Sequence, residues 1–278
     1  MAPGSSRQRL AGLVASVAAL AVLTACAEEL TEQEQAEQQE QEQAERVTFE
    51  IPELGACRVL APDDADQITN DGEVVDCAAG DHTAQTFAVG SFPDELTDAA
   101  YDDRRLGEFV FETCTDRFAE FIGGDESASL RSLVSWVWFR PQPDAWEAGA
   151  RWYRCDIVGG ADTSTAYRPL PEDASGLLNN RPDEWMACVR GPRVAQAERI
   201  PCSEPHDWRA ATTIQLGDEK AKYPGDRVVE VRTRDFCRTS ISAWLNYPTS
   251  YEFGYTWFRK AEWSVGNRRS VCWAKTDQ

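Results

Sequence analysis

The chain has 278 residues, and its 47 acidic against 28 basic side chains give a formal net charge of −19. This acidity argues against nucleic acid as a partner, because binding to phosphates needs a basic surface. The length leaves room for one large domain or two small ones after any targeting segment.

Residues 1–25 have the organisation of a bacterial lipoprotein signal peptide. Arg7 and Arg9 form a short positive region, and residues 10–23 are uncharged and rich in Ala, Val and Leu. This apolar run has the length of a secretory signal and is too short to span a bilayer comfortably. It ends in Leu23-Thr24-Ala25-Cys26, which resembles a lipobox. We expect cleavage before Cys26 and its lipidation, palmitate included, because two acyl chains anchor firmly where one does so marginally. An ordinary cleaved signal peptide is the alternative.

A strongly acidic stretch follows the predicted anchor. Residues 28–45 contain eight Glu and six Gln, without an aromatic side chain. Such a segment has nothing to bury against the entropy of ordering its backbone. We therefore predict that residues 26–46 are a lipidated, self-repelling tether, of which residues 28–45 reach at most roughly 60 Å at about 3.3 Å per residue.

The rest of the chain contains eight cysteines in two sets of four. Successive gaps are 20, 37 and 41 residues in the first set and 14, 35 and 35 in the second. An even number in an exported chain predicts four disulfides, and the similar gaps indicate a duplication. We expect the first to pair with the second and the third with the fourth inside each set, which comprises Cys57, Cys77, Cys114 and Cys155, then Cys188, Cys202, Cys237 and Cys272.

Local motifs repeat in the same way. The pattern W-x2-G-x-R-x3-C runs from Trp146 through Arg151 to Cys155, and again from Trp263 through Arg268 to Cys272. The only two histidines also correspond, because His82 follows Cys77 by five residues and His206 follows Cys202 by four. The repetition strengthens the case for two copies of one module.

In the first copy, residues 84–89 predict a strand. Val110, Cys114, Phe118 and Phe121 follow at i, i+4, i+8 and i+11, which predicts a helix with one apolar face. Gly123-Gly124 ends this helix, and residues 130–140 and 151–158 predict two further strands.

The second copy has the same order, with strands at 210–216, 255–259 and 269–274. Its helix carries Thr233, Cys237, Ile241 and Trp244 at identical offsets and ends at Asn246-Tyr247-Pro248. The fold class is therefore α+β, with two tandem disulfide-bonded β-α-β-β modules, each a helix packed on a small antiparallel sheet. We place the modules at residues 47–168 and 184–278. The Pro- and Gly-containing residues 169–183 are the expected linker, across which few contacts should pass, so that each module has its own core.

The cysteine spacing, the Cys202-Ser203-Glu204-Pro205-His206 element and the W-x2-G-x-R-x3-C ending resemble the septum-formation domain family. The resemblance covers nearly all of residues 47–278, although Gly80-Asp81-His82 departs from the family's C-x-x-P-H pattern. Members occur in actinobacterial membrane proteins and lipoproteins, often in tandem. The resemblance implies a role in the cell envelope near growth or septation and carries no established biochemical activity.

The remaining candidate residues each have two interpretations. His82 and His206 either close a turn or contact a ligand, and one histidine beside oxidised cysteines per module argues against a metal. Trp146 and Trp263 either belong to the core or stack on sugars, whereas Arg151 and Arg268 either hold a buried carboxylate or carbonyl or bind a ligand. The expected mature modules contain no nucleophile motif or free cysteine, so we expect neither an enzyme nor a cofactor.

Charge is the feature in which the copies differ. Residues 47–176 hold 26 acidic and nine basic side chains, whereas residues 177–278 hold 13 acidic and 16 basic ones. This difference indicates either separate partners or drift of a solvated surface. We expect a lipid-anchored protein on the extracytoplasmic face of the cell membrane that recruits or regulates envelope or division proteins. The alternative is a lipoprotein that binds a wall glycan or small solute.

Overall fold

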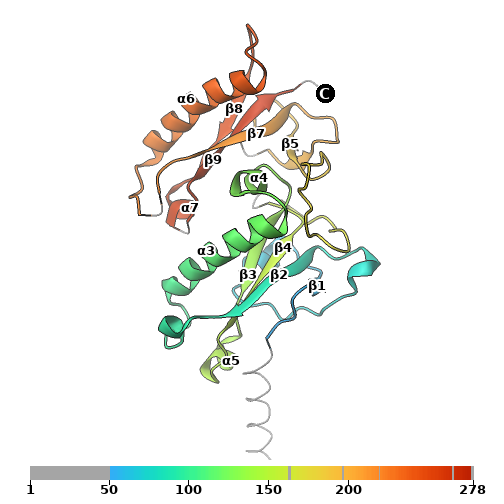
Figure 1. The fold of residues 1–278 in the computed structure, drawn as a ribbon, viewed down its shortest axis with the longest axis vertical. Helices are drawn as coiled ribbons and strands as arrows, with labels where there is room; N and C mark the ends of the chain where they lie inside the picture. Colours follow the sequence, from blue (N-terminus) through green and yellow to red (C-terminus); the bar gives the residue numbers. More distant parts are fainter. Residues whose placement is uncertain (1–50, 162–163, 196, 219, 265, 277–278) are drawn as a thin grey trace, which may run out of the picture. The chain divides into compact units, whose positions relative to one another are not determined.

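The computed structural model describes residues 51–161, 164–195, 197–218, 220–264 and 266–276. Contacts group residues 47–278 into one compact unit. It contains two antiparallel sheets, each with one long helix packed against it (Figure 1). The α+β class predicted from the sequence is confirmed.

The first sheet has the strand order β1-β2-β4-β3. Its strands are β1 (Cys57–Arg58), β2 (Ala84–Ser91), β3 (Ser135–Phe139) and β4 (Trp152–Val158). The long helix α3 (Arg104–Phe121) contacts β2, β3 and β4. Shorter helices are α2 (Pro62–Ala65), α4 (Glu126–Leu130) and α5 (Pro143–Glu147), with single 3-10 turns at Cys77–Ala79 and Asp94–Leu96.

Helix α3 forms as its apolar spacing predicts. Asp103 caps its first turn by accepting a hydrogen bond from the backbone of Arg105. Its buried face carries Leu106, Val110, Cys114 and Phe118, and Phe121 packs partly buried at the end. Gly123, with a φ of +70°, supplies the left-handed residue that terminates such a helix.

The second sheet has the strand order β6-β5-β7-β9-β8. Its strands are β5 (Ala187–Val189), β6 (Arg199–Pro201), β7 (Trp208–Gln215), β8 (Phe253–Thr256) and β9 (Arg269–Lys275). The long helix α6 (Asp226–Trp244) packs on β7, β8 and β9, and α7 (Lys260–Ser264) precedes β9.

Helix α6 buries Val229, Thr233, Cys237 and Ile241. The prediction that Trp244 continues this buried face is wrong, because its side chain is 45% exposed. It is the last residue of the helix, beyond the turn that covers the sheet, and its ring lines a cavity described below.

The central pairing is alike in the two sheets. Ala88 on β2 lies opposite Cys155 on β4, and Thr212 on β7 lies opposite Cys272 on β9. Each pair follows directly on a one-residue register shift. The expected strand-helix-strand-strand order is present in both halves. The sheets are wider than three strands, however, because the short β1, β5 and β6 add to their edges.

Two predicted strand boundaries need correction. Residues 130–140 do not form one strand, because Asp125 caps α4 by accepting a hydrogen bond from Ala128 and helix occupies the chain up to Leu130. In the second half, β8 ends at Thr256, so Trp257 to Arg259 lie outside the expected strand.

Residues 169–183 are not a loose linker. Leu170, Ala174 and Leu178 are buried, and the Leu178 amide donates to the carbonyl of Ile122 behind α3. The Leu170 amide likewise donates to the carbonyl of His82. The prolines and glycines turn this segment but do not free it from the first sheet.

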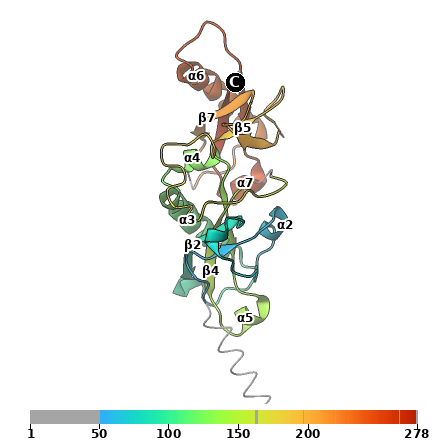
Figure 2. The same cartoon turned by 90° about the vertical axis from the view of Figure 1, so that its right-hand side faces the viewer.

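The expectation that few contacts cross between the halves is also wrong. Backbone hydrogen bonds join Leu133 to Trp185 and Ala187 to Arg131, and α4 contacts β7 (Figures 1 and 2). One buried cluster contains Phe87 of the first sheet together with Trp273 of the second. The two sheets therefore share part of their core, because neither covers all of its own apolar surface.

Candidate functional site

The predicted lipidation residue Cys26 lies outside the described residues, together with the signal peptide and tether. Its lipidation remains a prediction. Among the residues that the structure does describe, no helix is long and apolar enough to span a membrane.

The eight remaining cysteines form four disulfides with the predicted pairing. Cys114–Cys155 and Cys237–Cys272 join each long helix to the last strand of its sheet. These four cysteines are fully buried. The bonds Cys57–Cys77 and Cys188–Cys202 hold the segments that lead into β2 and β7. The bridges are thus structural, and they leave no thiol in the described residues for nucleophilic chemistry.

The repeated Trp and Arg residues form a corner before the last strand of each sheet. The Arg151 guanidinium lies 4.1 Å from the Trp146 ring and donates to its carbonyl over 2.6 Å. Arg268 lies 3.7 Å from the Trp263 ring and donates to that carbonyl over 2.6 Å. Trp146 and Trp263 are buried. These contacts favour the structural interpretation, in which each Arg fixes a tight corner through backbone carbonyls.

His82 is fully buried in the first sheet. Its Nε2 lies 3.1 Å from the carbonyl oxygen of Pro171, and its backbone carbonyl accepts from Leu170. Both contacts tie the start of β2 to the packed segment 169–183. These contacts favour the structural interpretation for His82, which belongs to a different sheet from His206. Its Nδ1 is buried and has no hydrogen-bond partner among the described residues.

His206 closes the turn of its C-x-x-P-H element. Its Nδ1 lies 2.7 Å from the carbonyl oxygen of Glu204, and its side chain is 5% exposed. Because a carbonyl only accepts, Nδ1 carries the hydrogen of this bond. The other ring nitrogen, Nε2, is buried and has no hydrogen-bond partner in the structure. It borders a cavity.

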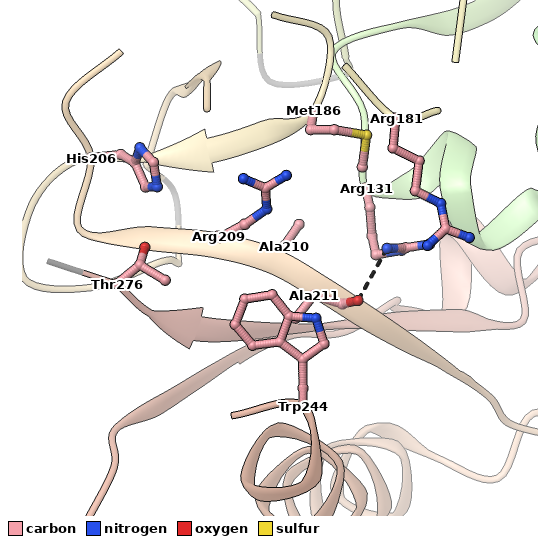
Figure 3. Close-up of a pocket in the computed structure, with 9 residues that line it drawn as sticks. All are labelled: Arg131, Arg181, Met186, His206, Arg209, Ala210, Ala211, Trp244 and Thr276. Atoms are coloured by element: carbon pink, nitrogen blue, oxygen red, sulfur yellow. Dashed lines mark hydrogen bonds between the residues drawn. The ribbon is translucent and has the colours of Figure 1, made fainter. Parts of the chain in front are cut away.

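This cavity, of about 230 Å³, brings together the positive charges of three arginines. Arg131 comes from the end of α4, Arg181 from the packed segment and Arg209 from β7 (Figure 3). Figure 3 places His206 and Thr276 at one end and Arg131 and Arg181 at the other, with the Trp244 ring below. We call this set the arginine cavity; its other lining residues are Met186, Ala210 and Ala211.

The charges of the arginine cavity are incompletely balanced. Arg131 is 7% exposed and donates to the carbonyls of Ser127 and Ala211, both over 3.0 Å. Burial lowers the pKa of its guanidinium, as do the nearby charges of Arg181 and Arg209, while Asp125 opposes them. Arg209 forms an ion pair with Asp183, whose pKa that hydrogen bond lowers. Within the described chain, no carboxylate forms an ion pair with Arg131 or Arg181.

A second depression of about 250 Å³ lies between α3 and the α7–β9 corner. Phe111 and Trp136 line one side, and Glu262 and Asn267 the other. Gly266 fits tightly against Phe111, since a Cβ there would lie 2.2 Å from the ring. The depression thus lies along the seam between the halves, and Trp136 is the one tryptophan among the residues that line it. In the described residues, no group of His, Cys, Asp and Glu has the arrangement of a metal site.

Comparison with known proteins assigns the family. The model of the family described as "Septum formation" matches residues 132–272, just over half of the chain. The chain belongs to the septum formation family. No curated protein and no solved structure matches it.

The family match is shorter than the resemblance predicted from residues 47–278. It begins at Ser132, so it contains both Trp–Arg corners and His206 but leaves out His82, Cys57, Cys77 and Cys114. Most of the arginine cavity falls within it, with Arg131 one residue before its start. Membership of the septum formation family suggests a role in cell division or the septum.

The cavity arginines were not identified from the sequence. Arg131, Arg181 and Arg209 are far apart in the chain, and no local pattern distinguishes them from other surface arginines. The available signal was the basic excess of residues 177–278, which contain two of the three.

Proposed function

We propose that this protein is a non-catalytic, membrane-anchored lipoprotein that recruits or regulates other proteins during cell-wall growth or septum formation. The family match over residues 132–272 carries the proposal. Four disulfides support export, because such bonds persist in oxidising compartments. The lipobox-like sequence ending at Cys26 supports attachment to the outer face of the membrane.

Exposed apolar side chains support a recruiting role. Five large ones occur within residues 51–74 and are between 45% and 61% exposed, namely Ile51, Leu54, Val59, Ile68 and Val74. Contiguous exposed apolar patches are typical of surfaces that bind proteins, so we propose that these side chains contribute to one. This segment follows the proposed tether in the chain, so a bound partner would stay within the reach of that tether from the membrane.

We also propose that the two halves are tandem copies of one module. The equivalent registers around Cys155 and Cys272, the matching helix disulfides and the two Trp–Arg corners support this view. Their opposite net charges would then give the copies different partners, with surface drift as the alternative.

A second candidate function is ligand binding. The arginine cavity favours it, because three guanidiniums and a buried unpartnered histidine nitrogen converge on one space. This alternative is compatible with a role in the envelope, since a bound wall component could control recruitment.

Imaging of a full-length fluorescent fusion in dividing cells tests the envelope role. We expect enrichment at the septum, with a reporter carrying only residues 1–46 as the matched control for anchoring alone. Equal distribution of both fusions around the cell would contradict a septal role.

Cys26→Ala tests the anchor separately. The variant should leave the membrane or accumulate as uncleaved precursor, measured by fractionation and mass spectrometry. Normally processed Cys26→Ala protein that stays in the membrane would exclude lipid anchoring through this residue.

A further inference from the structure

We propose that the arginine cavity is a binding site for a phosphoryl group carried by a small molecule, a wall polymer or a lipid headgroup. The cavity is lined by Arg131, Arg181, Arg209, His206, Thr276 and Trp244. The proposal is independent of the septal role, since it rests only on the chemistry of this cavity.

Unbalanced positive charge is the first observation. Of the three guanidiniums, the described residues provide an ion-pair partner only for Arg209, through Asp183. Arg131 cannot turn toward bulk water to escape its neighbours, because it is 7% exposed and held by two carbonyls. Like charges at a partly enclosed site are costly unless an anion compensates them. A bound anion would relieve this repulsion.

Unpartnered polar atoms at the other end of the cavity are the second observation. Nε2 of His206 and Oγ1 of Thr276 are both buried, and neither has a hydrogen-bond partner among the residues that the structure describes. A buried polar atom without a partner costs about 1–3 kcal/mol in general. Both atoms border the same space as the arginines (Figure 3). A ligand that fills this space would give each of them a partner.

The donor set favours phosphate over carboxylate. Three guanidiniums and one hydroxyl offer more donors than the two oxygens of a carboxylate accommodate well, whereas a phosphate has three or four oxygens. Nδ1 of His206 faces the Glu204 carbonyl, so Nε2 is the ring nitrogen left for a ligand.

Size and shape indicate what accompanies the phosphoryl group. A cavity of about 230 Å³ is smaller than the roughly 300–1,000 Å³ of sites for drug-sized ligands. It suits one small anion or a single headgroup. The 45% exposed Trp244 ring at its wall provides a flat surface on which a ring attached to the phosphate can stack.

Calorimetric titration of the purified full-length, oxidised protein tests the site, with inorganic phosphate and acetate as probes at one ionic strength. Phosphate should bind more tightly than acetate. Arg181→Asn should weaken phosphate binding about tenfold, the usual effect of losing one charge-assisted hydrogen bond. Asn tolerates the left-handed backbone at position 181, where φ is +50°, so the fold should persist.

Arg193→Asn is the matched control, since Arg193 is exposed and does not line the cavity. It makes the same change in charge and should leave phosphate affinity unchanged. Thermal melts verify that both variants are folded. Absence of phosphate binding, equal weakening by the two variants, or acetate binding as tight as phosphate would overturn the assignment.

Phenyl phosphate tests the stacking surface. Trp244→Ala should weaken phenyl phosphate about three- to tenfold and leave inorganic phosphate unaffected, as expected for loss of an aromatic contact. Equal weakening of both probes would overturn the stacking role.

Vesicles of phosphatidylcholine with and without phosphatidic acid then identify the source of the phosphoryl group. If the protein is retained on vesicles that contain phosphatidic acid and Arg181→Asn abolishes this retention, the ligand is a lipid headgroup. If the protein binds phosphate but is not retained on the vesicles, the ligand is a soluble or wall-borne phosphate.

Discussion

The two sheets fill equivalent positions with opposite chemistry. Arg154 and Asp156 flank Cys155 on β4, whereas Val271 and Trp273 flank Cys272 on β9. Because side chains alternate along a strand, these pairs lie on the sheet face opposite the helix and its disulfide. The same strand frame therefore supports a polar layer in one half and an apolar layer in the other.

The polar layer of the first sheet is fully buried. Asp156 accepts from Arg154 over 3.0 Å and from Thr86 over 2.7 Å, and Arg58 donates to the Thr86 hydroxyl over 2.9 Å. Arg154 also donates to Asn70, in the loop that covers this face. Arg154 and Asp156 thus pair with each other, while Arg58 is held by hydrogen bonds to the Thr86 hydroxyl and the Gly72 carbonyl.

The apolar layer of the second sheet has Trp273 at its centre. Its side chain is 1% exposed, and Nε1 donates to the Thr256 hydroxyl over 3.2 Å. Trp273 belongs to the cluster shared by both halves. The segment that covers a sheet face thus decides the chemistry of that face. A polar loop covers this face in the first half, and the core of the other half covers it in the second.

Asp156→Ala should have the largest effect, because it leaves the buried Arg154 guanidinium without its ion-pair partner and the Thr86 hydroxyl without its acceptor. We expect a loss of about 3–5 kcal/mol in the free energy of unfolding, measured by denaturant titration. The equivalent mild change, Trp273→Phe, should cost about 1–2 kcal/mol. The double variant Arg154→Met with Asp156→Met should be less damaging than Asp156→Ala alone. The opposite order would show that the charges are not mutually dependent.

The contribution of each disulfide to the free energy of unfolding should depend on the length of the loop that it closes and not on the sheet to which it belongs. Replacing Cys237 and Cys272 by Ala opens a 35-residue separation, and replacing Cys188 and Cys202 opens one of 14. The chain-entropy model predicts losses of about 4 and 3 kcal/mol respectively. Cys114 with Cys155, separated by 41 residues, should match the larger value. Unequal losses for the two helix disulfides, measured by denaturant titration, would indicate that the two halves depend on them differently.

Substitutions in the Trp–Arg corners should change the stability of the two halves by smaller amounts. Arg151→Met should cost about 1–2 kcal/mol through lost carbonyl and cation–π contacts. Arg268→Met should cost less, since its Nε lies 3.4 Å from the Asp218 carbonyl whereas Arg151 Nε lies 2.6 Å from that of Thr97. Thermal melts of both variants give the order. A larger loss for Arg268→Met would contradict this assignment.

The smallest expected effect concerns the tyrosine beside each corner. Tyr101 packs on Trp146 and donates to the Pro141 carbonyl, whereas Tyr223 packs on Trp263 and donates to the Asp226 carboxylate. Burial, followed by this carboxylate, raises the pKa of Tyr223 to about 12. The folded pKa exceeds the usual value of about 10, so the stabilisation is complete below pH 10 and is lost as the pH rises through about 12.

Alkaline titration followed by tyrosinate absorbance measures this pKa, with Tyr223→Phe identifying the component that belongs to Tyr223. Asp226→Asn should move the Tyr223 titration toward lower pH. An unchanged titration in Asp226→Asn would show that the carboxylate has no influence on the phenol.

Local signals predicted much of the fold. The number of cysteines predicted four disulfides without fixing their pairing, and the four-residue spacing of Val110, Cys114 and Phe118 predicted the buried face of α3. Short edge strands such as β5 have only three residues, too few for a periodic signal. Leu170, Ala174 and Leu178 recur at intervals of four, yet the surrounding prolines and glycines concealed their burial.

The candidate site was the least predictable part. His206 was identified because its motif repeats, but Arg131, Arg181 and Arg209 meet only through tertiary packing. Trp244 was assigned to the buried helix face from its offset, although the helix ends at that residue. The apolar periodicity shows which face of the helix is buried but not how far the sheet extends along it. The exposure of Trp244 at the end of α6 therefore could not be predicted.

The burial of residues 169–183 has a consequence for the cooperativity of the protein. Because Leu170 and Leu178 complete one half while the adjoining Trp185 and Ala187 complete the shared cluster, opening either half exposes surface of the other. The two halves should then unfold in a single calorimetric transition, and their amide hydrogens should be protected from exchange to a similar extent. A partner that binds and stabilises one sheet would slow amide exchange in both. Binding to one half would therefore be detectable in the other half without a conformational change.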